Sequence, residues 1–209
     1  PDPATSNRST IGGMIANNSA GMRSIGFGMT CDYIEELRVV LSDGSLHTIR
    51  CENEHQWADN AKRDDRFGEI HRAIEQQITA HREQILQRWP DLPRRPSGYD
   101  LKSFCGPKPW HLGQIITGSE GTLAMVTEAK LRLIPCMTAT SMVVMHFDSA
   151  DEAMRDLPQI LTQNVTACEL LDRDMLVESL RNPATAQMTD FLKGQPGAVL
   201  IVEVDTPDQ

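Results

Sequence analysis

The sequence predicts an α+β fold in two parts: antiparallel strands flanked by helices, followed by alternating strands and helices. Three observations support this prediction. Asp43-Gly44 lies between two apolar runs and is typical of a tight hairpin turn. Residues 68–89 have the apolar periodicity of a helix, and strand-like and helix-like segments alternate after Pro135. With 209 residues, 40% of them hydrophobic, the chain is long enough for one large domain or two small ones.

The N-terminal part of the sequence is rich in glycine and asparagine. Residues 1–9 are polar and contain proline, which predicts an extended loop, and residues 24–30 are predicted as a glycine-rich loop. Between them, Thr10-Ile-Gly-Gly-Met-Ile-Ala-Asn-Asn-Ser-Ala-Gly21 predicts one or two helical turns over residues 11–18. Two interpretations are open: a helix packed closely against a sheet, or a cradle of backbone N–H groups for a phosphate or a flat polar ring. The segment is neither a Gly-x-Gly-x-x-Gly nor a Walker motif.

A hairpin and a long helix are predicted next. Residues 34–41 and 46–49 have strand composition, whereas residues 52–66 are highly polar. The helix predicted at 68–89 ends before Pro90, and we expect it to be a scaffold element that covers a sheet. Its apolar stripe consists of Ile70, Ile74, Ile78 and Ile85.

A second glycine-rich stretch precedes another predicted strand. A long loop is predicted over residues 94–113, and four of its side chains face either a ligand or the solvent: Tyr99, Asp100, Lys102 and His111. Gly118-Ser-Glu-Gly121 then enters a strand that starts at about Thr122, and residues 131–134 are predicted to return as its hairpin partner. The glycines either free backbone amides beside a planar cofactor or belong to an ordinary bulge.

The pattern changes after Pro135. Ser149 and Glu152 form a capping box that starts a helix, which Pro158 should kink or shorten. Asp172 caps a second helix that stops near Asn182. Three strands are predicted here, over residues 141–147, 165–171 and 198–204. The resulting β-α-β-α-β order resembles part of a split-βαβ layer.

This change of pattern places a domain boundary near residues 136–140. We expect a first domain at 1–138, with a helical insertion at about 52–96, and a second, partial domain at 139–209. The sequence opens on Pro1-Asp-Pro-Ala without an initiator Met or a signal peptide, so we expect a domain from within a longer protein.

Charge and composition exclude several classes of function. The net charge is −9 and the pI about 5.1, without a dense Lys/Arg cluster, which argues against a nucleic acid or an anionic membrane as partner. The sequence lacks an apolar run of the roughly 18 residues that a membrane span needs. The five scattered cysteines include no Cys-x-x-Cys, so we expect no metal site, reduced buried thiols and a cytoplasmic location.

Three segments together resemble the FAD-linked oxidases, the vanillyl-alcohol-oxidase type with a PCMH-type FAD-binding domain. They are Pro1-Asp-Pro with residues 9–21, then Ser97-Gly-Tyr-Asp-Leu101, then residues 118–128 with Lys130-Leu-Arg-Leu-Ile-Pro135. They occur in the order of the family. The resemblance implies that residues 1–138 form the second subdomain of the FAD-binding domain, and that 139–209 begin a ferredoxin-like substrate or cap domain.

The resemblance also assigns roles to individual residues. One group would line the flavin through backbone groups and short side chains: Pro1, Thr10, Gly12, Gly13, Asn17, Ser19 and Gly21. A second group would pass near the flavin ring and ribityl chain: Gly118, Ser119, Gly121 and Thr122. Val126 would offer backbone hydrogen bonds toward the adenine, and Glu120 would orient its own loop. Ala20 stands where the family often has Ser, so one hydrogen bond is missing.

The resemblance is strongest to D-lactate, glycolate and D-2-hydroxyglutarate dehydrogenases. It implies hydride transfer from a D-2-hydroxy acid to FAD and an electron acceptor as second partner. The insertion at 52–96 is similar to that of large bacterial members with a downstream iron–sulfur region. The family's pyrophosphate-binding subdomain and its substrate-binding arginines and histidines fall outside these residues. We therefore expect weak or absent FAD binding, no catalytic residue and a homodimer for the chain by itself.

Two alternatives remain open at this point. The chain could be a scaffold or interaction module that keeps the fold without holding flavin. It could also belong to a different flavoenzyme of the same superfamily, such as a sugar-nucleotide reductase. The exit from Pro135 into a strand–helix–strand segment disfavours the second alternative.

Overall fold

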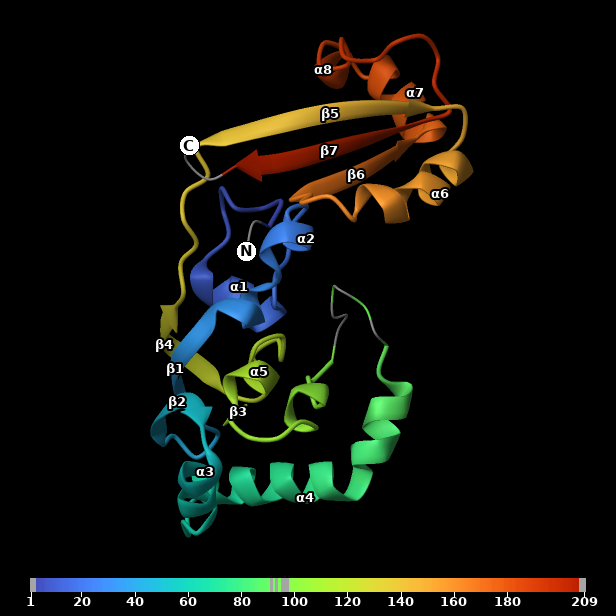
Figure 1. The fold of residues 1–209 in the computed structure, drawn as a ribbon. Helices are drawn as coiled ribbons and strands as arrows, with labels where there is room; N and C mark the ends of the chain where they lie inside the picture. Colours follow the sequence, from blue (N-terminus) through green and yellow to red (C-terminus); the bar gives the residue numbers. More distant parts are fainter. Residues whose placement is uncertain (1–2, 91, 93, 95–97, 207–209) are drawn as a thin grey trace. The chain divides into compact units, whose positions relative to one another are not determined.

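The protein is described from a computed structural model, which describes residues 3–90, 92, 94 and 98–206 (Figure 1). These residues divide into two units. The first unit contains residues 3–20 and 29–133, and the second contains residues 21–28 and 134–206. The domain limits expected from the sequence, 1–138 and 139–209, stay predictions because both ranges include residues outside the described ones.

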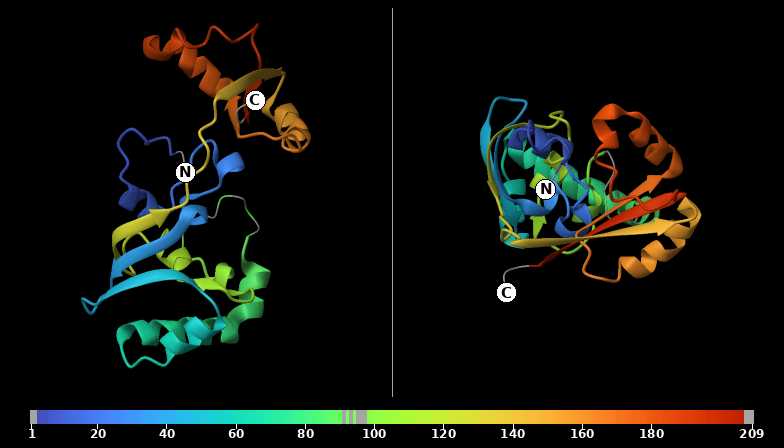
Figure 2. Two further views of the ribbon diagram at one scale, coloured as in Figure 1. Left: turned by 60° about the vertical axis from the view of Figure 1, so that its left-hand side comes forward. Right: turned by 90° about the horizontal axis from the view of Figure 1, so that it is seen from above.

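The first unit is built on an antiparallel sheet with the strand order β3-β2-β1-β4 (Figures 1 and 2). The predicted hairpin is confirmed. Its turn is held by the Asp43 carboxylate, which accepts a hydrogen bond from the amide of Ser45 at 2.9 Å, while Gly44 has a φ of +82°. The strands are β1 (Ile34–Val40), β2 (Leu46–Glu52), β3 (Trp110–His111) and β4 (Met125–Leu131).

The partner predicted for β4 is wrong. β4 does not pair with residues 131–134 but runs antiparallel to β1, with Val126 opposite Val39. The amide of Arg132 still donates to the carbonyl oxygen of Tyr33 at 2.9 Å, after which the chain leaves the sheet and Leu133 is 86% exposed. The apolar run that predicted a separate strand is therefore the end of β4 and its exposed continuation.

Helices pack around this sheet. The helix predicted at 11–18 is α1 (Ile11–Asn17), and the long helix predicted at 68–89 is α4 (Arg66–Arg88). The polar segment 52–66, which belongs to the predicted helical insertion at about 52–96, contains a helix whose bounds were not predicted, α3 (Glu54–Ala61). Asn53 and Gln56 form a reciprocal capping box at its start, with both side-chain hydrogen bonds at 3.0 Å. The predicted loop 94–113 contains short elements: η2 (Lys102–Phe104), β3 and the first residue of α5 (Gly113–Ile116).

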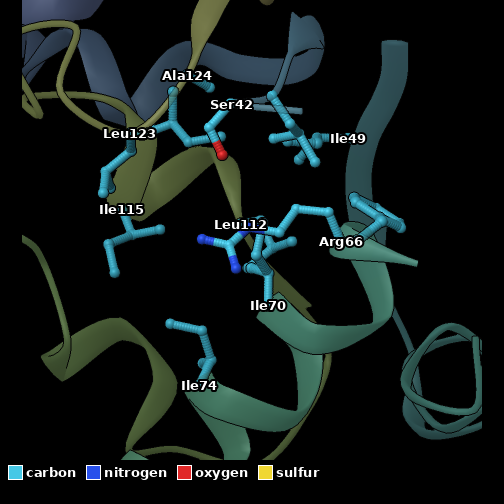
Figure 3. Close-up of a pocket in the computed structure, with 12 residues that line it drawn as sticks. Ser42, Ile49, Arg66, Ile70, Ile74, Leu112, Ile115, Leu123 and Ala124 are labelled. Carbon is cyan, nitrogen blue, oxygen red and sulfur yellow. The ribbon is translucent and has the colours of Figure 1, made fainter. Parts of the chain in front are cut away.

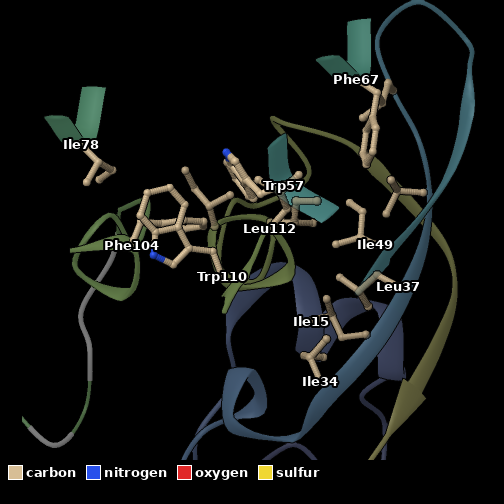
Figure 4. Packing of buried hydrophobic residues seen from close by; sticks show 14 of the residues in the cluster. Ile15, Ile34, Leu37, Ile49, Trp57, Phe67, Ile78, Phe104, Trp110 and Leu112 are labelled. Atoms are coloured by element: carbon tan, nitrogen blue, oxygen red, sulfur yellow. The ribbon is translucent and has the colours of Figure 1, made fainter. Parts of the chain in front are cut away.

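The core of the first unit has an aliphatic and an aromatic part. The first half of α4 packs near the hairpin and α5 and leaves a small apolar cavity (Figure 3). Ile15 of α1 points toward Leu37 of β1 (Figure 4). The aromatic part contains Trp57, which packs edge-on against Trp110 with ring centroids 5.0 Å apart. Trp57 is fully buried, which explains why the polar segment 54–61 folds as a helix.

A buried ion pair lies beside these rings. The Nε2 atom of His71 is 3.0 Å from the carboxylate of Glu52, and its Nδ1 atom is 2.8 Å from the carbonyl oxygen of Phe67. Both ring nitrogens therefore lie within hydrogen-bond distance of an oxygen atom. Burial acts to raise the pKa of Glu52, but hydrogen bonds from His71 and Asn60 outweigh it, and the net pKa is lowered.

The second unit contains a sheet with the order β5-β7-β6. Both outer strands are antiparallel to β7, so β5 and β6 run parallel to each other with β7 between them. This arrangement confirms the split-βαβ prediction and, with the first unit, the α+β class. The strands are β5 (Ala139–Phe147), β6 (Ala167–Asp172) and β7 (Ala198–Thr206), and the helices are α6 (Ala150–Ile160), α7 (Arg173–Arg181) and α8 (Pro183–Ala186). Ser149 and Asp172 cap α6 and α7 as predicted, and α6 ends two residues after Pro158.

The glycine-rich loop predicted at 24–30 is wrong in part. Residues 24–27 form a short helix, α2 (Ser24–Phe27), and a 3-10 helix, η1 (Thr30–Tyr33), starts at Thr30. The helix α2 belongs to the second unit, where the amide of Gly26 donates to the carbonyl oxygen of Thr166 at 3.3 Å. A Cβ atom at Gly26 would lie 2.9 Å from the Cα atom of Thr166, so this contact requires glycine. The contact is long-range, so local composition did not predict it.

The structure also bears on the membrane and cysteine predictions. Within residues 3–90, 92, 94 and 98–206, helices of membrane-spanning length and hydropathy are absent. Of the five cysteines, Cys31 and Cys105 are buried, Cys168 is half-buried, and Cys51 and Cys136 are exposed. The expectation of buried thiols therefore holds for Cys31 and Cys105 and is wrong for the exposed Cys51 and Cys136.

Candidate functional site

The two glycine-rich segments of the sequence lie side by side in the first unit. The amide of Gly118 donates to the carbonyl oxygen of Ile15 at 2.9 Å, and the amide of Glu120 donates to the carbonyl oxygen of Ala16 at 2.8 Å. Carbonyl groups in the last turn of a helix have no partner within the helix. The loop at 117–122 supplies two of these partners for α1, so helix and loop form one local structure.

Side chains strengthen the same junction. The Asn17 amide donates to the carboxylate of Glu120 at 2.8 Å, across 103 residues of sequence. Asn18 ends α1 in the left-handed conformation, with a φ of 52°, and its side-chain oxygen accepts a hydrogen bond from the amide of Cys31 at 2.9 Å. Gly118 has a φ of +87°, and a Cβ atom there would lie 3.1 Å from the Cβ atom of Asn18. Glycine at 118 therefore serves both the turn and the close approach.

Most amides of the loop are used inside the protein. In addition to the amides of Gly118 and Glu120, the amide of Ser119 donates to the carbonyl oxygen of Ile116 at 3.1 Å. The amide of Thr122 donates to the carbonyl oxygen of Ser119 at 3.0 Å. The interpretation of this stretch as a row of free N–H groups does not hold at these four positions. Their hydrogen bonds instead hold the loop in one conformation beside α1.

A polar cavity of about 460 Å³ lies beside α1 and the loop. Asn17, Ala20 and Gly118 line it from the two glycine-rich segments, together with Arg94 and Asp100. Thr117 also lines it, and its hydroxyl is buried without a hydrogen-bond partner among the described residues. A buried hydroxyl without a partner costs free energy, so a ligand atom or a water molecule at this position is favoured.

The long loop brings charged groups to this cavity. Arg94 donates from Nη2 to the carbonyl oxygen of Ala20 at 3.1 Å. Asp100 is buried and accepts hydrogen bonds from the Ser103 hydroxyl at 2.5 Å and the Ser103 amide at 3.2 Å. Because guanidinium has five N–H donors, Arg94 keeps donors for an anionic group of a ligand.

The predicted residues of the first segment have different surroundings. Pro1 lies outside the described residues. Thr10 caps α1, with its hydroxyl accepting a hydrogen bond from the amide of Gly13 at 3.1 Å. Gly12 is exposed, and a Cβ atom there would meet no atom of the described residues within 4 Å. Ser19 donates to the side-chain oxygen of Asn17 at 3.3 Å. Among the described members of this group, only Asn17 lines the cavity. Gly21 is buried in the second unit.

The predicted residues of the second segment also lie in different surroundings, and not all of them line the cavity. Gly118 lines the cavity, whereas Ser119 is buried behind it. Gly121 has a φ of +73° and open space where a Cβ atom would stand, and Thr122 lies 2.8 Å from the Tyr99 hydroxyl, measured between the two oxygens. Val126 lies in β4, a strand at the edge of the sheet.

Two candidate residues of the long loop, His111 and Tyr99, make hydrogen bonds within the protein. The Nδ1 atom of His111 accepts a hydrogen bond from the amide of Gly113 at 2.8 Å, so Nε2 carries the proton and donates to the carbonyl oxygen of Glu35 at 3.2 Å. Burial lowers the pKa of His111. Its ring is therefore a structural group, and Tyr99 likewise supports Thr122.

Two residues that line the cavity, Thr117 and Arg94, were not predicted from the sequence. The buried hydroxyl of Thr117 leaves no pattern in the sequence, and Arg94 contacts Ala20, which lies 74 residues away in the chain.

The chain is similar to several known proteins. Residues 1–50 match the family model described as FAD binding domain. The chain resembles proteins of the FAD-linked oxidase family over most of its residues. It is 32% identical over 178 residues to D-2-hydroxyglutarate dehydrogenase of Escherichia coli, which covers 84% of this chain and 18% of that protein. It is 27% identical over 211 residues to the glycolate oxidase subunit GlcD of Bacillus subtilis, which covers 99% of this chain and 33% of that protein.

The chain thus spans about a fifth to a third of the length of these relatives. Among solved structures, alkyldihydroxyacetonephosphate synthase matches 99% of this chain and 31% of its own length, with a TM-score of 0.56 and 18% identity. This likeness supports the fold. The resemblance to FAD-linked oxidases inferred from the sequence motifs is confirmed.

Proposed function

We propose that this chain forms one wall of an FAD site in an enzyme that oxidises a D-2-hydroxy acid. The observation that carries the proposal is the junction of the two glycine-rich segments at one polar cavity, through the hydrogen bonds of Gly118 and Glu120 to α1. The match of residues 1–50 to an FAD binding domain supports the cofactor. The names of the relatives, which include D-2-hydroxyglutarate and D-lactate dehydrogenases, support the class of substrate.

The described residues fit part of a flavin nucleotide. Gly12 and Gly121 leave exposed backbone with open space where a side chain would otherwise stand, so a planar ring can approach closely. The unpartnered hydroxyl of Thr117 offers a hydrogen bond to a polar atom of the ligand. A cavity of about 460 Å³ holds only part of a dinucleotide, so the 209-residue chain by itself should bind FAD weakly or not at all.

In this proposal, bound FAD supplies the hydride acceptor for the oxidation. The residues of this chain would bind part of the FAD and hold it in a fixed orientation. Asn17 and Glu120 fix the loop against α1, Thr117 holds a polar ligand atom, and Arg94 balances negative charge on a phosphate or carboxylate. We assign no residue of this chain as the base that takes the proton of the substrate hydroxyl.

The proposal extends to partners that the whole protein would use. These are a small 2-hydroxy acid, an electron acceptor and an iron–sulfur cluster held by a downstream region. For the 209-residue chain by itself, a homodimer is part of the same proposal. A cytoplasmic location belongs to the same proposal. The electron acceptor and the cluster involve other parts of the protein.

Activity measurements test the proposed function directly. The natural protein that contains this chain, reconstituted with FAD, is assayed with D-lactate, glycolate and D-2-hydroxyglutarate and a dye as electron acceptor. We expect turnover of at least one of these acids. Absence of turnover with all three, in a protein that holds FAD, would contradict the proposed substrate class.

A second candidate function is a scaffold of the same fold without flavin. The internal hydrogen bonds of four loop amides favour it, because those donors are not free to bind a cofactor. A titration of FAD into the natural protein that contains this chain, followed by flavin fluorescence, discriminates between the two functions. Micromolar binding that the Gly12→Leu variant weakens rules out the scaffold.

A further inference from the structure

A second cavity lies inside the first unit, apart from the polar one. It has a volume of about 160 Å³ and shares no lining residue with the 460 Å³ cavity. The first half of α4, the end of the β1–β2 hairpin and α5 enclose it (Figure 3). Its walls are aliphatic, with Ile49, Ile70, Ile74, Ile115 and Leu123 as main contributors.

The size and walls of this cavity define the body of a ligand. An apolar cavity of about 150 Å³ lined by aliphatic and aromatic side chains stays free of water and can hold a benzene-sized molecule. The lining here is of that kind and of similar volume. A single six-membered ring or a compact branched alkyl group therefore matches the space, whereas a larger ring system exceeds it.

Two polar side chains stand at the same cavity. Arg66 and Ser42 both line it, and Figure 3 shows the guanidinium group and the hydroxyl turned toward the space between the aliphatic residues. Both residues are exposed, which places them at the solvent side of the cavity. Arg66 pairs with Glu69 through Nη1 at 2.9 Å. Its guanidinium has further N–H donors in a planar fork, which is suited to a carboxylate.

We propose that this cavity is a binding site for a small monocarboxylic acid with a compact apolar body. The body lies among Ile70, Ile74 and Ile115, and the carboxylate accepts hydrogen bonds from Arg66 and Ser42. A dicarboxylic acid is excluded because its second carboxylate would be buried among aliphatic side chains without a partner. The site is separate from the proposed flavin wall and does not depend on it.

Benzoate is the probe that tests this site. The 209-residue chain is titrated with sodium benzoate and followed by NMR of amide and methyl groups. We expect saturable shifts at Ile74, Ile115 and Ala124, with a Kd of about 1 mM or tighter. Shifts that do not saturate, or that lie away from the lining residues, would overturn the proposal.

Related probes and variants test separately the apolar contacts of the ring and the contact of the carboxylate with Arg66. Benzyl alcohol keeps the ring without the charge, and acetate keeps the charge without the ring, so each should bind at least about tenfold more weakly than benzoate. Arg66→Gln should weaken benzoate by at least about fivefold and leave benzyl alcohol unchanged. Arg88→Gln, an exposed arginine on the same helix but outside the cavity, is the matched control and should change neither.

A cavity-filling variant tests the location independently of charge. Ala124→Leu places a larger side chain into the lining, and its folding is checked by the cooperativity of thermal unfolding. A folded Ala124→Leu chain should lose benzoate binding. If this variant is folded and binds benzoate like the unmodified chain, or if Arg66→Gln has no effect, the assignment is wrong.

Discussion

The amide of Gly118 and the carbonyl oxygen of Ile15 form a hydrogen bond of 2.9 Å that joins the two glycine-rich segments of the first unit. The contact depends on a left-handed glycine beside Asn18. The loop supplies a partner for the carbonyl oxygen of Ala16 and a second partner for that of Ile15, to which the amide of Asn18 also donates at 3.2 Å. Stability at this place therefore depends on both segments.

Replacing the glycine at this junction should destabilise the protein. Gly118→Ala places a Cβ atom at a φ of +87° and 3.1 Å from the Cβ atom of Asn18, so we expect a loss of about 1–3 kcal/mol in the free energy of unfolding. Urea unfolding followed by tryptophan fluorescence measures it. Gly44→Ala is the matched control, with a φ of +82° but open space, and should cost less. Equal losses would mean that the approach to Asn18 is not tight.

The buried pair of Glu52 and His71 should matter far more than a surface pair. The Glu52 side chain is 9% exposed and that of His71 is fully buried, so Glu52→Gln removes a charge next to a buried imidazole. We expect a loss of about 3 kcal/mol in the free energy of unfolding. Glu54→Gln is the control, because its side chain is 82% exposed and lies 3.8 Å from Lys108, and it should change stability by less than about 0.5 kcal/mol.

The same pair predicts a pH dependence of stability. Burial acts to raise the pKa of Glu52, but hydrogen bonds from His71 and Asn60 bring it below the ordinary value of 4.5. A carboxyl group with a lowered folded-state pKa contributes stability that is complete above its unfolded pKa and is lost as the pH falls. The unmodified chain should lose stability more steeply below pH 4.5 than Glu52→Gln. Parallel acid titrations of the two chains, followed by circular dichroism, check this difference.

In the second unit, an ion pair holds the early segment 21–28 in place. The Nε atom of Arg23 is 2.8 Å from the carboxylate of Glu203, whose side chain is 7% exposed. Arg23→Gln leaves this carboxylate without its cationic partner, so we expect about 2 kcal/mol less protection of β7 amides in hydrogen exchange. Arg181→Gln breaks an exposed pair with Glu178 and should leave the exchange rates unchanged. Equal effects of both variants would contradict the role of Arg23.

Elements with strong local signals were predicted from the sequence. The turn at Asp43-Gly44, the isoleucine stripe of α4 and the caps at Ser149 and Asp172 each depend on residues within a few positions. The missed features depend on distant partners. The helix α3 combines a local signal, the capping box of Asn53 and Gln56, with a distant contact of Trp57 with Trp110. The strand β4 pairs with a strand about 90 residues earlier, as the Arg38–Glu128 pair shows.

The candidate site also has features with a local sequence signal and features that depend on distant contacts. The two glycine-rich stretches were found from composition and order, and the structure brings them together. Which of their residues line the cavity could not be inferred, because the sequence motif does not distinguish residues that line it, such as Asn17 and Gly118, from those that do not, such as Thr10. Thr117 and Arg94 carry no motif, and only the three-dimensional arrangement places them at the cavity.

The most direct test of the flavin wall is the FAD content of the natural protein that contains this chain, with and without Gly12→Leu. Gly12 is exposed, and a side chain there meets no atom of the described residues within 4 Å, so the variant should fold normally. We expect about one FAD per unmodified chain, seen as flavin absorbance, and at least about tenfold weaker FAD binding in the variant. An unmodified protein that stays colourless after reconstitution with FAD, or a variant that binds FAD equally well, would contradict it.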